Sequence, residues 1–137
     1  MSELLHASAV ELGQLIASGA ASSREVVQAH LDRIDAVDAD VRAFLHVAAE
    51  RALVAAAAVD SKRAAGDPLG PLAGVPIAIK DLFCMTGAPT TAGSRILEGW
   101  HPPYNATVTQ RVLDADLVAL GKTNLHEFAM GASTENS

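Results

Sequence analysis

The stretch GPLAGVPIAIKDLF, residues 70–83, decides the fold. Its apolar run, Val75–Ile79, is bounded by glycine and proline and ends abruptly in Lys80 and Asp81. Short continuous apolar runs of this kind are typical of strands in parallel sheets, which are covered on both faces. Clefts in open α/β sheets form at the carboxyl ends of the strands, so Lys80 becomes a candidate for chemistry.

The position of Lys80 at a strand end is open to two interpretations. In the first, the surrounding groups partly desolvate the side chain and favour the neutral amine, the form that can act as a base. In the second, Lys80 marks the exit of the strand into solvent and pairs with Asp81 or another acid, as structural ion pairs do. The spacing of the residues leaves both interpretations open.

A second apolar run, Leu117–Leu120, predicts another strand. Before it, Thr107 and Gln110 have the spacing of a capping box, which predicts a helix through about Asp114. Strand, crossover, helix and strand is the order of a βαβ unit, in which the two strands run parallel. We therefore expect the two apolar runs to form neighbouring or near-neighbouring strands.

The front of the chain, about residues 1–66, has helical patterns. Ser-x-x-Glu at 8–11 and at 22–25 predicts two helix starts. A third, alanine-dense helix should end at Gly66, and residues 42–47 before it should be extended. The predicted fold class is therefore α/β, with a mixed sheet covered by helices, a helical front and a βαβ-like back.

Composition excludes several classes of protein. The 137 residues carry a net charge of −6, which argues against direct non-specific binding of nucleic acid. No apolar stretch is long enough for a membrane span, and the first residues do not have the pattern of a signal peptide. Cys84 is the single cysteine, so a disulfide within the chain is impossible and a cytoplasmic location fits.

Two short motifs are incomplete. His126–Glu127 begins like the zinc-binding pattern HExxH, but Met130 stands where the second histidine belongs. Gly121–Thr123 resembles the end of a phosphate-binding loop, but Asp116 replaces the required glycine. We therefore predict neither a metal site nor a nucleotide site in this chain.

Five segments together carry a family resemblance. They are GPLAGVPIAIKDLF (70–83), TTAGSRIL (90–97), EGWHPPYNATV (98–108), ALGKTNLHEFAMG (119–131) and STENS (133–137). In this order and spacing they resemble the amidase signature family, over essentially the whole chain. The segments 98–108 and 133–137 are most similar to the branch of the family that serves glutamyl-tRNA(Gln) amidotransferases.

The resemblance implies a Ser-Ser-Lys hydrolytic site in which Lys80 is the base. The lysine would act through a bridging serine on a second serine, the nucleophile that attacks the amide. In the amidotransferase branch the amide donor is glutamine, and the ammonia passes to the B and C subunits of the complex. There ATP and Mg²⁺ are used to convert Glu-tRNA to Gln-tRNA, so the chain itself would need no cofactor and would meet tRNA only through its partners.

The chain departs from the family pattern in one decisive respect. The Gly-Gly-Ser-Ser-Gly-Gly block that holds both serines in the family does not occur in the sequence. We therefore expect residues 1–137 to be a single partial amidase domain, a fragment without amidase activity of its own. Asp116 is a second departure, because members of the family usually have glycine between this helix and strand, where it suits a left-handed conformation.

The loop after the second strand supplies the remaining candidate residues. In the family the equivalent loop borders the substrate pocket, which makes Ala129, Met130, Gly131 and Ser133 candidate lining residues. Ordinary loop packing is the alternative. Two other functions stay open: a general amidase for small amides, and a non-catalytic remnant or interaction module.

Overall fold

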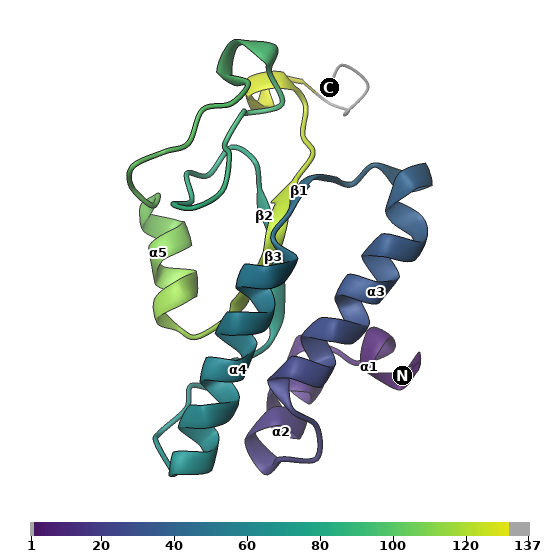
Figure 1. Cartoon of the computed structure of the whole chain (residues 1–137), viewed down its shortest axis with the longest axis vertical. Helices are drawn as coiled ribbons and strands as arrows, with labels where there is room; N and C mark the ends of the chain where they lie inside the picture. Colours follow the sequence, from purple (N-terminus) through teal and green to yellow (C-terminus); the bar gives the residue numbers. More distant parts are fainter. Residues whose placement is uncertain (1, 132–137) are drawn as a thin grey trace.

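The computed structural model describes residues 2–131. The elements in chain order are α1 (Ser2–His6), α2 (Ala9–Ser18), α3 (Ser23–Val41), β1 (Phe44–Val47), α4 (Ala49–Ala65), β2 (Pro76–Lys80), α5 (Thr107–Asp114) and β3 (Val118–Thr123), with single 3-10 turns η1 (Arg95–Leu97) and η2 (Glu127–Ala129). Helices and a small mixed sheet form one α/β fold (Figure 1). The predicted fold class is therefore confirmed.

The described sheet has the strand order β1-β3-β2. β2 and β3 are parallel neighbours, as the βαβ pattern predicts, and β1 is antiparallel to β3. β3 extends past the predicted end at Leu120 as far as Thr123. Within the described residues β3 is the central strand and β2 lies at an edge, so β2 is not covered like the central strand that its apolar run suggests.

The helix signals of the front half are confirmed. Ser8 with Glu11 and Ser22 with Glu25 form complete capping boxes at α2 and α3. Gly66 follows α4 in the left-handed conformation. These caps satisfy free backbone groups at the helix ends, which is why they locate the ends well.

The capping box predicted for α5 is wrong, although the helix itself is present. Ala106 occupies the cap position and has no side-chain oxygen to accept a bond. Gln110 instead accepts a hydrogen bond from Asn105 and donates one to Asp114, at 2.7 Å each. The helix is held by its packing and by these contacts rather than by a capping box.

The sheet separates two apolar layers. α3 and α4 cover one face, and α5 with the preceding loop covers the other (Figure 1). Neighbouring residues of β3 divide between the layers, because Val118 and Leu120 join the first core and Ala119 joins the second. The front helices are thus packing elements that support one face of the sheet.

Asp116 adopts the predicted left-handed conformation after α5, with φ of 59°. Its carbonyl accepts a hydrogen bond from Gly74 N at 2.8 Å. Its carboxylate pairs with Lys62 at 2.7 Å, and this contact offsets part of the conformational cost. The aspartate in place of glycine is therefore accommodated by this fold.

Candidate active site

Lys80 is the last residue of β2 and lies at the carboxyl edge of the sheet, paired with Thr123 of β3. Alternation along the strand directs its side chain away from the face that Ile79 covers, and the residue is exposed. The expected partial burial of Lys80 is therefore wrong for the described residues. The physical reason is the edge position of β2, which leaves this side of the strand open.

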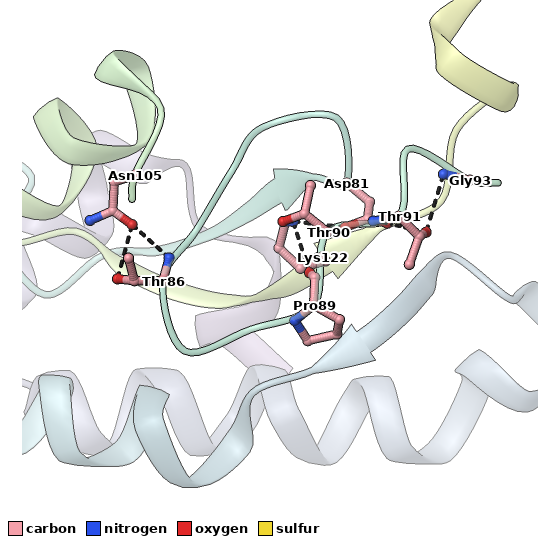
Figure 2. Close-up of polar contacts among 8 residues, drawn as sticks. All are labelled: Asp81, Thr86, Pro89, Thr90, Thr91, Gly93, Asn105 and Lys122. Atoms are coloured by element: carbon pink, nitrogen blue, oxygen red, sulfur yellow. Dashed lines mark hydrogen bonds and ion pairs between the residues drawn. The ribbon is translucent and has the colours of Figure 1, made fainter. Parts of the chain in front are cut away.

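Asp81 pairs with Lys122 of β3 and not with Lys80. The ion pair between Lys80 and Asp81 that the second interpretation expected is therefore not formed. The distance from Asp81 Oδ1 to Lys122 Nζ is 2.7 Å. Nζ also donates to Thr90 Oγ1 at 2.6 Å and to the Pro89 carbonyl at 3.1 Å (Figure 2). Lys122 is 0% exposed and Asp81 is 1% exposed, so the three acceptors satisfy the ammonium group away from water.

The second carboxylate oxygen of Asp81 holds the loop that follows β2. Oδ2 accepts from Thr91 N at 2.9 Å and from Thr91 Oγ1 at 2.6 Å. Thr91 Oγ1 in turn accepts from Gly93 N at 3.2 Å (Figure 2). The Asp81 carbonyl accepts from Ala92 N at 3.1 Å. One buried residue next to Lys80 therefore joins two strands and a loop.

The turn after β3 packs onto this same loop. Ser94 Oγ donates to Glu127 Oε1 at 2.6 Å, and Phe128 N donates to the Ala92 carbonyl at 2.8 Å. Phe128 and Ala129 have φ of 51° and 60°, the left-handed region that non-glycine residues occupy at a cost of about 1–2 kcal/mol each. Contacts outside the turn therefore have to stabilise its conformation.

The candidate lining residues lie in and after this turn. Ala129, Met130 and Gly131 are exposed, and Met130 is 73% exposed. They follow β3 at the edge of the sheet where Lys80 ends β2. Ser133 lies outside the described residues. Their role in lining a substrate pocket stays a prediction.

Neither a metal centre nor a membrane span is found in the part of the chain that the structure describes. Among residues 2–131, no three histidine, cysteine or acidic side chains are grouped so that they could hold a metal ion. No helix in the same range has the length and apolar character needed to cross a membrane.

Residues 25–137 match the Amidase family, which is most of the chain. The chain belongs to the amidase family. The carboxyl edge that carries Lys80, the Asp81–Lys122 pair and the turn after β3 is thus part of an amidase fold. The family assignment from the sequence motifs is confirmed.

A subunits of glutamyl-tRNA(Gln) amidotransferases are similar to the chain in sequence. The chain is 65% identical over all 137 residues to the A subunit of the glutamyl-tRNA(Gln) amidotransferase from Thermobifida fusca, and it covers 28% of that protein. It is 60% identical over 137 residues to the corresponding protein of Streptomyces coelicolor, again with 28% of the relative covered. The chain therefore spans little more than a quarter of the length of these curated relatives.

Solved structures, two of them amidases by name, share the fold. The peptide amidase of Stenotrophomonas maltophilia has a TM-score of 0.83 and 36% identity, covering 88% of this chain and 25% of that one. A bacterial aryl acylamidase of the amidase signature family has a TM-score of 0.86 and 33% identity over 93% of this chain and 27% of that one. A chain from a vestigial complex linked to the origins of an s-triazine catabolic enzyme has a TM-score of 0.90 and 43% identity, covering 95% of this chain and 29% of that one.

Sequence reasoning missed Lys122 in this chain. The predicted strand ended at Leu120, because glycine and lysine are uncommon inside strands. Gly121 is required there, since a side chain would collide with the His46 carbonyl of β1. One signal in the sequence could have found it. A lysine lies near the end of one predicted parallel strand, and an aspartate directly follows the other predicted strand.

His46 should make the stability of this chain sensitive to pH. Burial lowers the pKa of His46, and the nearby charges of His101 and Lys122 lower it further, against the opposing effect of Asp81. The folded state therefore binds this proton less readily than the unfolded state, and stability should fall as the pH drops below about 6.5.

We expect replacement of His46 by glutamine to flatten this part of the pH profile. Because the histidine is only half-buried, the difference between pH 7 and pH 5 should stay below about 1 kcal/mol. Urea unfolding of wild type and variant at a series of pH values measures it. Parallel profiles for the two proteins would contradict the role of His46.

Proposed function

We propose that this chain is part of the glutamine-hydrolysing subunit of a glutamyl-tRNA(Gln) amidotransferase. The observation that carries the proposal is the identity of 65% over all 137 residues to a protein of that kind. Solved amidases that act on other amides are less similar, at 36% for the peptide amidase and 33% for the aryl acylamidase.

The proposed chemistry centres on Lys80. In the whole subunit the lysine would accept the proton of a bridging serine, which activates a second serine for attack on the glutamine side-chain amide. Ammonia leaves, and water releases glutamate from the acyl-enzyme. The exposed position of Lys80 at the carboxyl edge of the sheet leaves its side chain accessible to such groups.

The proposed partners are the B and C subunits of the complex, in the cytoplasm. The ammonia would be used there with ATP and Mg²⁺ to convert Glu-tRNA(Gln) to Gln-tRNA(Gln). This division of work agrees with the net charge of −6, because an acidic chain is poorly suited to hold tRNA itself. The chain would contribute no cofactor.

The test is an ammonia-release assay on the full-length protein, with and without its partner subunits. We expect glutamine to be the preferred amide and release to rise when the partners, ATP and Glu-tRNA(Gln) are present. Equal hydrolysis of small unrelated amides without partners would instead identify a general amidase. A full-length protein that binds the partners but hydrolyses no amide would identify an interaction module.

A further inference from the structure

The turn after β3 combines strain with exposure. Phe128 and Ala129 are consecutive non-glycine residues in the left-handed region, with φ of 51° and 60°. Such conformations persist only where the surrounding structure stabilises them, and they cluster at functional sites. Met130, which follows, is 73% exposed. The turn therefore presents an apolar side chain to solvent from a backbone that other residues must hold.

One side-chain contact to this turn comes from a distant segment. Ser94 is 5% exposed, and its hydroxyl donates to the Glu127 carboxylate at 2.6 Å across 33 residues of sequence. A hydrogen bond to a carboxylate is stronger than one between neutral groups. Ser94 Oγ also accepts from Ile96 N at 3.2 Å, which holds the hydroxyl in place. Glu127 is itself exposed, so the buried Ser94 hydroxyl is the fixed side of the contact, and it restrains the first residue of the turn.

Backbone hydrogen bonds connect this turn to Asp81, the residue beside Lys80. Phe128 N donates to the Ala92 carbonyl at 2.8 Å, and Ala92 N donates to the Asp81 carbonyl at 3.1 Å. Asp81 directly follows Lys80, and β2 and β3 end at the same edge of the sheet. The turn and Lys80 are thus connected by a short series of hydrogen bonds through one loop.

We propose that the Ser94–Glu127 hydrogen bond positions the turn of residues 127–131 as a wall of the amide-binding site next to Lys80. The proposal rests on the proposed function, because it assigns a substrate-binding role to the same edge of the sheet. Ser94 and Glu127 are positioning residues and do not touch the reacting atoms. Loss of their contact weakens substrate binding more than the chemical step, because Lys80 is held separately by β2.

Steady-state kinetics of the full-length protein with its partner subunits tests the binding role. Ser94→Ala and Glu127→Ala should each raise KM for glutamine by about tenfold and change kcat by less than about threefold. The double variant should resemble either single one, because both remove the same contact. Glu127→Gln keeps an oxygen that accepts from Ser94 and should restore most of the affinity. Ser61→Ala is the matched control, because Ser61 is an exposed serine bonded within α4.

Hydrogen exchange gives a second readout that does not depend on activity. Amides of residues 125–131 should exchange about tenfold faster in Ser94→Ala, while amides of α3 and α4 keep their wild-type rates. Unchanged exchange in the turn would contradict the claim that the Ser94–Glu127 hydrogen bond restrains it. Faster exchange with an unchanged KM would contradict the role of the turn in substrate binding. Wild-type protein that hydrolyses no amide would reject the proposed function, and the exchange rates would still decide whether Ser94 and Glu127 hold the turn.

Discussion

Replacing Lys122 with methionine in the full-length protein should lower the free energy of unfolding by about 3–5 kcal/mol. The substitution removes the only charge that faces the buried Asp81 carboxylate among the described contacts and leaves Thr91 as its side-chain partner. An unpaired buried charge is costly because neither water nor a counter-ion compensates it. Urea unfolding, followed by circular dichroism, measures the loss.

Two variants separate the buried charge from a general effect of losing a lysine. Lys62→Met removes the surface pair with Asp116, in which the lysine side chain is 45% exposed, and should cost less than about 1 kcal/mol. Adding Asp81→Asn to Lys122→Met removes the unpaired negative charge of Asp81 and should recover part of the lost stability. If Lys122→Met costs no more than Lys62→Met, the buried pair does not hold the two strands together.

Local signals predicted the helical front well because each one acts within a few residues. A serine and a glutamate three positions apart satisfy free backbone groups at both α2 and α3. A glycine after α4 adopts the left-handed conformation that ends the helix. The parallel pairing of β2 and β3 was predictable for a different reason, because a helical crossover admits few connections.

The candidate site was harder to predict because its contacts join distant residues. Asp81 and Lys122 are 41 positions apart, and local patterns cannot show that a lysine inside a strand finds a buried acid. The Ser94–Glu127 contact spans 33 positions and has the same difficulty. The exposure of Lys80 depends on β2 lying at an edge of the described sheet, which an apolar run alone does not reveal.

Replacing Lys80 with methionine should abolish glutamine hydrolysis by the full-length protein, with a loss of about 10³-fold or more in kcat. Methionine keeps the length of the side chain but cannot accept a proton. Lys80 is exposed among residues 2–131, so the part of the fold that these residues form should keep its stability to within about 0.5 kcal/mol. Ammonia release and urea unfolding, measured on the same preparation, test both expectations.

Lys80→Arg distinguishes a base from a structural cation. Arginine keeps the positive charge but stays protonated, so it should be as inactive as methionine if Lys80 accepts a proton. Lys62→Met is the matched control for removal of an exposed lysine and should keep full activity. Substantial activity in Lys80→Arg would mean that this position needs only a charge, and the base would then have to be another residue. The buried Lys122 is an unsuitable replacement, because its three acceptors already occupy the ammonium group.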